Sequence, residues 1–180
     1  TLITNAQVNV NDSLALVDLY NSTDGPHWYN HKNWLKEPVN TWYGVTVKGN
    51  SATALNLSVN FLRGPLPSSL GNLTNLTRLD LYNNQLSCII PPALGNLSNS
   101  TYLSLYSNEL SGSIPPELGI LSKIKYLLLE QNKLNGNITK ELGNFSSLLN
   151  LNLSYNKLSG NIPPELSKLN SFFTKPFYLS

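Results

Sequence analysis

Apolar residues recur along this chain in columns that are 24 residues apart. Each block contains a Leu-x-Leu pair, of which Leu55 and Leu57 are the first example. Because side chains alternate between the two faces of a strand, both leucines of a pair point to the same face. The pattern therefore predicts a short strand in each of five successive blocks: 52–75, 76–99, 100–123, 124–147 and 148–171.

A strand this short cannot bury its apolar face alone, whereas stacked copies can pair as a parallel sheet about 4.8 Å apart and share one core. Two further apolar columns, which begin at Leu62 and Leu66, supply the rest of that core. Leu-Gly pairs later in the blocks predict short helical turns that end at the glycine: 70–71, 94–95, 118–119 and 142–143. The sequence thus predicts an α/β repeat solenoid, in which replacing one column leucine by alanine costs about 2–5 kcal/mol.

Polar columns mark the turns of the predicted solenoid. One asparagine per block, beginning with Asn60, follows the second strand leucine by three residues. A buried amide both donates and accepts, so we expect each asparagine to bond its own turn and the next one. A glycine column marks a second turn, and Cys88 replaces the glycine in the second block. We expect this single cysteine to be a small buried apolar residue.

Residues 11–51 predict an N-terminal cap, in which Asn11 or Asp12 caps a short helix and segment 43–47 forms a strand. The cap contains three tryptophans, and aromatic faces of this kind can stack on sugars or bases. We expect them instead to fill the core of the cap, because tryptophan buries a large apolar area. These residues are Trp28, Trp34 and Trp42.

The two ends of the chain lie outside the repeat pattern. Residues 1–10 have the composition of a strand and are predicted to form an arm or a linker. Residues 172–180 begin a sixth, incomplete repeat after a two-residue insertion. Because an open stack exposes apolar residues, we expect either further chain or another molecule to cover this end.

Residues 110–119 read Leu-Ser-Gly-Ser-Ile-Pro-Pro-Glu-Leu-Gly, and residues 158–166 nearly repeat them. Over residues 52–171 the chain resembles the 24-residue, Ile-Pro-containing leucine-rich repeats of plant receptor-kinase ectodomains. The segments 15–28 and 42–47 resemble the caps of secreted microbial and algal members, and the cysteine pair usual in plant caps is absent. The resemblance implies a parallel sheet on a concave face and a protein that binds rather than catalyses.

Positions that flank the strand leucines point outward from the predicted sheet. Tyrosines gather at these positions in blocks two to four, together with charged residues. Tyrosine is common on exposed sheets because of its β-propensity, but it also offers rigid, amphipathic contact area for a partner. We predict that this face binds a protein, peptide or glycan through the following residues: Arg78, Asp80, Tyr82, Tyr102, Tyr106, Tyr126, Glu130 and Tyr155.

Composition argues against several other functions. Charged residues make up 12% of the chain, the net charge is +2, and no basic run suggests a nucleic-acid partner. No apolar stretch is long enough to span a membrane. His27 and His31 lie beside no cysteine or carboxylate cluster, so we expect no metal and no cofactor. Asp80 and Glu130 lie on an open sheet with no pocket to raise a pKa, so we predict no enzyme.

Ten Asn-x-Ser/Thr sequons indicate the secretory pathway and an extracellular or cell-surface location, although the repeat itself also favours such sequences. The candidate glycosylation sites are Asn11, Asn21, Asn56, Asn72, Asn75, Asn96, Asn99, Asn137, Asn144 and Asn152. Two functions remain open. The chain is either an adhesive or receptor-like recognition module, or a subunit of a surface layer or fibre whose copies stack head to tail.

Overall fold

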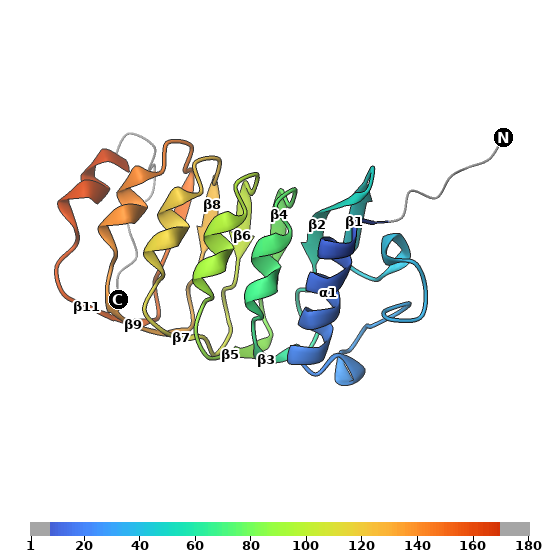
Figure 1. The fold of residues 1–180 in the computed structure, drawn as a ribbon. Helices are drawn as coiled ribbons and strands as arrows, with labels where there is room; N and C mark the ends of the chain where they lie inside the picture. The colour runs from blue at the N-terminus through green and yellow to red at the C-terminus, as the bar shows by residue number, and fades with distance from the viewer. Residues whose placement is uncertain (1–7, 170–180) are drawn as a thin grey trace.

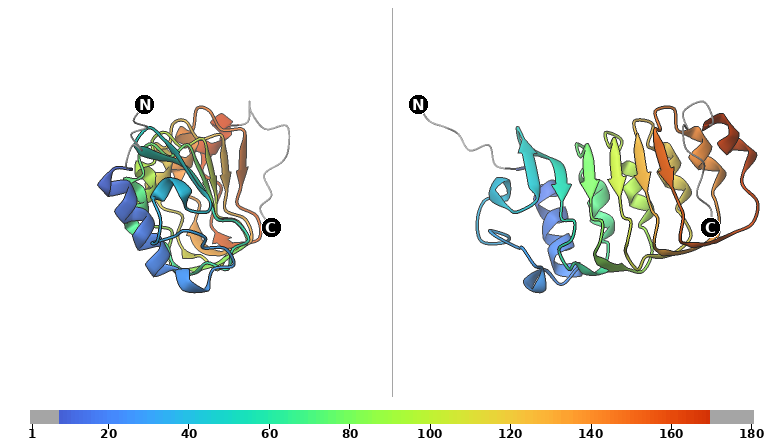
Figure 2. Two further views of the ribbon diagram at one scale, coloured as in Figure 1. Left: turned by 90° about the vertical axis from the view of Figure 1, so that its right-hand side faces the viewer. Right: turned by 180° about the vertical axis from the view of Figure 1, so that it is seen from behind.

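The computed structural model describes residues 8–169 as a solenoid of stacked coils, with the helical cap at one end and the last repeat at the other (Figure 1). The strands of the main sheet line one side of the solenoid and the helices line the other (Figure 2). The main sheet has the strand order β1-β2-β4-β6-β8-β10. Its strands are β1 (Val45–Lys48), β2 (Ser51–Asn56), β4 (Arg78–Asp80), β6 (Tyr102–Ser104), β8 (Tyr126–Leu128) and β10 (Asn150–Asn152).

The register of the main sheet repeats the sequence period. β1 pairs with β2 in antiparallel orientation, and every later pair is parallel. Leu55 pairs with Leu79, Leu79 with Leu103, and the same 24-residue step continues to the end of the sheet. The strand leucines of all five repeats are buried. The predicted repeat solenoid with a parallel sheet is confirmed.

After the turn that follows its main-sheet strand, each coil contributes a second, short strand. These strands form two narrow sheets with the orders β3-β5 and β11-β9-β7. Their strands are β3 (Arg63–Pro65), β5 (Gln85–Ser87), β7 (Ser111–Gly112), β9 (Lys133–Asn137) and β11 (Lys157–Ser159). A short 3₁₀ helix then closes each coil. These helices are η3 (Ser68–Asn72), η4 (Pro92–Asn96), η5 (Pro116–Ile120), η6 (Lys140–Asn144) and η7 (Pro164–Leu169).

The glycines of the Leu-Gly pairs lie inside the 3₁₀ helices, so the prediction that they end a helical turn is wrong. Neighbouring helices pack so closely that a Cβ atom on Gly95 would collide with the carbonyl oxygen of Glu117 in the next coil. Gly71 and Gly119 face equivalent carbonyl oxygens. Glycine is therefore required at this position for close packing and not for chain reversal.

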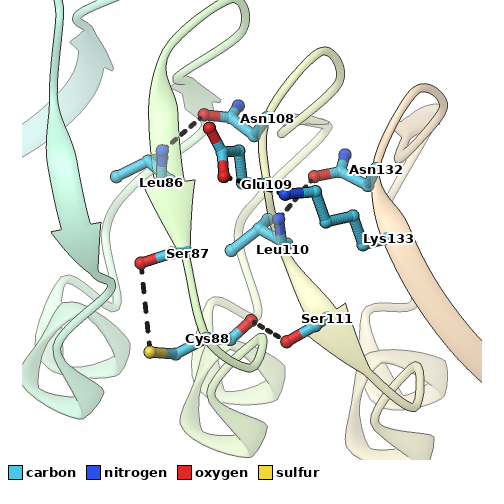
Figure 3. Close-up of polar contacts among 9 residues, drawn as sticks. All are labelled: Leu86, Ser87, Cys88, Asn108, Glu109, Leu110, Ser111, Asn132 and Lys133. Atoms are coloured by element: carbon cyan, nitrogen blue, oxygen red, sulfur yellow. Dashed lines mark hydrogen bonds and ion pairs between the residues drawn. The ribbon is translucent and has the colours of Figure 1, made fainter.

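The asparagine column joins consecutive coils. Asn108 Oδ1 accepts from the Leu86 N–H at 3.0 Å, and its Nδ2 donates to the carbonyl oxygens of Leu81 and Leu105 at 3.1 and 3.0 Å. Asn132 repeats the first of these bonds with Leu110 (Figure 3). The asparagine therefore bonds its own turn, as predicted, but its second partner is the preceding coil and not the following one.

Cys88 is exposed, so the prediction of a buried cysteine is wrong. Its φ is +66°, the left-handed conformation that glycines adopt at the equivalent turns, with values of +76° at Gly112 and Gly136. The backbone carbonyl of Cys88 accepts from the Ser111 hydroxyl, while its thiol lies 3.9 Å from the Ser87 hydroxyl (Figure 3). The turn directs the side chain outward, whatever residue occupies it.

The cap begins with α1 (Val10–Ser22), whose N-cap is Asn9. The Asn9 side chain accepts from the Asp12 N–H at 2.9 Å, so the prediction of Asn11 or Asp12 as N-cap is wrong. The buried Asp12 carboxylate instead accepts from the Ala52 N–H at 2.7 Å. This bond joins α1 to β2 and thereby seats the cap on the first repeat.

The three tryptophans form the core of the cap, as predicted. Trp28, Trp34 and Trp42 are at most 6% exposed. Trp34 contacts both of the others, with ring centroids 4.9 and 4.7 Å apart. Each indole N–H donates to a backbone carbonyl within the cap, so the rings also hold the loops around them.

Part of the predicted end segments lies outside the described residues. The predicted sixth repeat, 172–180, falls there entirely, as does most of the predicted arm, 1–10. Of the arm, Val8 is buried and Val10 is the first residue of α1.

Candidate functional site

The outward positions of the main sheet, together with the second residue after each repeat strand, form what we call the sheet face. Four of the predicted tyrosines form two ring pairs on it. Tyr82 and Tyr106 stack with centroids 4.7 Å apart and planes 3° from parallel. Tyr102 and Tyr126 lie 5.8 Å apart at 45°. Both pairs follow from the sheet register, because residues 24 apart occupy neighbouring strands.

Tyr155 is placed differently from the other predicted tyrosines. It lies in the turn after β10, at a φ of +54°, and is 65% exposed. Among the described residues, the Tyr155 ring is in neither of the two tyrosine pairs. The structure therefore brings together four of the five tyrosines that the sequence assigned to the face.

Arg78 is held by two neighbours on the sheet face. Its guanidinium donates to Asp80 Oδ2 at 2.5 Å, and its central carbon lies 3.7 Å from the centroid of the Tyr102 ring. A carboxylate and an aromatic face thus bind the same cation. The predicted residues Arg78, Asp80 and Tyr102 form one cluster.

Three buried oxygens of the sheet face have no hydrogen-bonding partner among the described residues: Asp80 Oδ1, Ser104 Oγ and Glu130 Oε2. A fourth such atom, Ser69 Oγ, lies on a 3₁₀ helix. Asp80 is 3% exposed, and Ser104 is fully buried between strand neighbours. An unpartnered buried acceptor costs about 1–3 kcal/mol, so unsatisfied hydrogen-bonding capacity is concentrated on this face.

Glu130 and Tyr106 have perturbed acidities. Burial raises the pKa of the Glu130 carboxyl above its usual range. Burial also raises the pKa of Tyr106, with further increases from Tyr82, Glu130, Tyr102 and Asp80. The expectation that this sheet contains no environment to raise a carboxyl pKa is therefore wrong for Glu130. The Glu130 side chain is half-buried even though the sheet is open.

A polar groove that the sequence did not indicate lies at the end of β1 and in the loops that precede the repeat strands. Lys48, Asn75, Asn99 and Lys123 line it. Lys123 Nζ donates to Asn99 Oδ1 at 2.6 Å. The 24-residue spacing of Asn75, Asn99 and Lys123 is visible in the sequence, but their column lies outside the strands whose outward positions predicted the binding face.

Eight of the ten sequon asparagines are exposed, and Asn99 and Asn152 are half-buried. Asn56 and Asn152 lie on the sheet face at opposite ends of the tyrosine cluster. Each accepts from the hydroxyl of the serine two residues later, at 2.8 Å. The other eight lie away from that cluster, on α1, at the end of β9, on the 3₁₀ helices and in the loops between elements.

Neither His27 nor His31 belongs to a cluster of possible metal ligands within residues 8–169. His27 Nδ1 lies 2.7 Å from Asp24 Oδ1, and His31 Nδ1 lies 3.2 Å from the carbonyl oxygen of Trp28. Among the described helices, none has the length and apolar character needed to cross a membrane.

The family model described as Leucine Rich Repeat matches four segments that together cover just over half of the chain: residues 51–73, 75–97, 99–121 and 147–169. The third and fourth of these segments flank a repeat that the model does not match. A search of curated proteins finds no significant match.

Solved structures match most of the chain. The structure of the BIR3–SERK2 complex from Arabidopsis thaliana contains a chain that is 31% identical, with a TM-score of 0.75 over 93% of this chain and 98% of that chain. The PEPR1–AtPEP1 structure matches at 30% identity and a TM-score of 0.77, over 86% of this chain and 22% of that chain. The plant peptide hormone receptor RGFR1 in complex with RGF2 matches at 40% identity and a TM-score of 0.67, over 70% and 20%. The chain thus spans about a fifth of the PEPR1 and RGFR1 chains.

Proposed function

Because the chain belongs to the leucine-rich-repeat family, we propose that it is a non-enzymatic binding module that recognises a protein, peptide or glycan through its tyrosine-rich sheet face. The observation that carries this proposal is the joint presence of two tyrosine pairs and three unpartnered buried oxygens on one face. Aromatic rings supply apolar contact area, and a ligand whose donors reach the unpartnered oxygens would supply the hydrogen bonds that they lack.

The similar structures support the same class of partner. The RGFR1 structure is that of a peptide hormone receptor with RGF2, and the BIR3–SERK2 structure is a complex of two proteins. We extend this to a peptide or protein ligand for the present chain, with a glycan as the other ligand class. The repeats are proposed to be of the 24-residue Ile-Pro type, with a cap of the microbial and algal kind.

We further propose an extracellular or cell-surface location, with glycans on some of the ten sequons. Exposure of eight of these asparagines is compatible with modification. The alternative of head-to-tail assembly rests mainly on residues 1–10 and 172–180, most of which lie outside the described part of the chain. Recognition through the sheet face is therefore the function that we propose.

A double variant, Tyr102→Ala with Tyr126→Ala, tests the binding face. Immobilised wild-type protein is used to select binding peptides from a displayed library of random dodecapeptides. The same protein in solution is used to screen a glycan array for binding glycans. We expect the recovered ligands to lose most of their binding to the double variant, because both rings of one pair are removed. Tyr29→Ala is the matched control, since Tyr29 is 79% exposed on the cap.

Thermal unfolding of each variant shows whether the fold is retained. Ligands that bind the folded double variant as well as wild type would refute the sheet face as the binding surface. The same conclusion would follow if both screens returned no ligand that depends on these two tyrosines.

A further inference from the structure

Within the described repeats, three side chains of the sheet face carry formal charge: Arg78, Asp80 and Glu130. The first two neutralise each other through their 2.5 Å ion pair. Glu130 is in none of the ion pairs among the described residues, which join His27 to Asp24, Arg78 to Asp80 and Lys133 to Glu109. One oxygen of its carboxylate is buried without a partner. Among the described repeats, the sheet face therefore has one negative charge without an ion-pair partner, and the side chain that carries it is half-buried.

Glu130 occupies the same position of its repeat as Tyr106 does in the preceding one. The backbone places them side by side, because the Ser107 N–H donates to the carbonyl oxygen of Glu130 at 2.9 Å. Tyr82 stacks on one face of the Tyr106 ring. A stacked tyrosine and an unpaired carboxylate are thus neighbours near the centre of the face.

Elsewhere on the sheet face, a tyrosine ring and a carboxylate already bind one cationic side chain, that of Arg78. Arg78 lies over the Tyr102 ring and donates to Asp80, so that one guanidinium satisfies an aromatic face and a carboxylate together. Tyr106 and Glu130 offer the same two chemical groups, and no arginine or lysine among the described residues pairs with that carboxylate. A planar cation with several N–H donors fits both groups.

We propose that Tyr106 and Glu130 form a subsite for a cationic side chain, arginine or lysine, of the peptide or protein ligand. This inference rests on the proposed function and specifies the chemistry of its ligand. An arginine in the subsite donates to Glu130 and stacks against the tyrosines, which repeats the contacts of Arg78. A neutral side chain of the same shape lacks the ionic part of the interaction.

The test uses two small compounds, Nα-acetyl-arginine methylamide and its neutral isostere Nα-acetyl-citrulline methylamide. Each is titrated into the ¹⁵N-labelled chain at low salt, where screening is weak. We expect saturable shifts of the Tyr106 and Gln131 amide signals with the arginine compound. The citrulline compound is expected to bind about tenfold more weakly, as is the arginine compound to the variant Glu130→Gln.

Glu117→Gln is the matched control, because it removes the same charge from an exposed residue of η5 on the helical side of the solenoid. This variant should bind the arginine compound as wild type does. Equal binding of the two compounds, unchanged binding to Glu130→Gln, or no saturable shift would each overturn the subsite. The tyrosine-dependent ligands of the preceding experiment would still be recovered in that case, so failure of the subsite and failure of the binding face are distinguishable.

Discussion

The side-chain amide of Asn108 donates to the carbonyl oxygen of Leu81, which lies 27 residues earlier in the chain, at 3.1 Å. The same side chain also accepts from the Leu86 N–H and donates to the carbonyl oxygen of Leu105. Asn108 is 8% exposed, so water has little access to these groups. One side chain thus satisfies buried backbone groups in two successive coils.

The substitution Asn108→Ala should destabilise the fold by about 3 kcal/mol or more, because it leaves several buried backbone groups without partners. Urea denaturation of wild type and variant measures this difference. Asn135→Ala provides the control, since Asn135 is exposed on β9, and it should change stability by no more than about 0.5 kcal/mol. A loss below about 1 kcal/mol at Asn108 would mean that its bonds do not hold the coils together.

The substitution Cys88→Gly should stabilise the fold by about 0.5–1 kcal/mol. The left-handed conformation costs a residue with a side chain about 1–2 kcal/mol. Glycine avoids that cost, and the greater freedom of the unfolded chain offsets about half of the gain. Denaturation under reducing conditions measures the change, and Cys88→Ala, which retains a Cβ atom, should give no comparable gain. Equal stabilities of the glycine and alanine variants would contradict the prediction.

Glu130→Gln should stabilise the fold relative to wild type as the pH rises. The pKa of Glu130 is raised in the folded state, so the fold favours its protonated form. The stability that the protonated carboxyl adds is fully present below the ordinary glutamate pKa of 4.5. It is lost as the pH rises through the higher pKa of Glu130 in the folded state. The free energy of unfolding of the two proteins is compared from pH 4 to pH 8.

Glu109→Gln is the control of opposite sign. The hydrogen bond and charge of Lys133 lower the pKa of Glu109 in the folded state. The stability that the ionised Glu109 adds is therefore present above pH 4.5 and is lost as the pH falls through that lower pKa. This variant should therefore lose stability relative to wild type near neutral pH. The same pH trend for both variants would contradict the assigned causes.

Expression through a secretory pathway should give a glycosylated protein. Intact-mass measurement before and after enzymatic removal of N-linked glycans detects the modification. Asn75→Gln tests one exposed site in the polar groove, and the variant should be lighter by one glycan. A mass equal to that of the bare polypeptide would refute the proposed modification.

The sequence by itself determined the coils, the strand register and the asparagine column. In a solenoid each coil contacts mainly its neighbours, so residues at a fixed spacing in the sequence are also neighbours in space. The exposure of Cys88 could be predicted in the same way, because the glycines at the equivalent positions of other repeats indicate a left-handed turn. That position directs a side chain to water, and the usual burial of free cysteine was the weaker guide.

Only the tertiary structure decided which side chains complete one another. Asn9, Asn11 and Asp12 are all suitable N-caps by residue type, and the bond between Asp12 and Ala52 leaves Asn9 in that role. On the sheet face, the spacing placed Arg78 and Glu130 on the same surface but did not show that only Arg78 has a partner of opposite charge. Repeat spacing fixes where backbone positions lie. Rotamers, burial and the matching of donors with acceptors depend on all neighbours at once, and these decide which polar groups of the face stay without a partner.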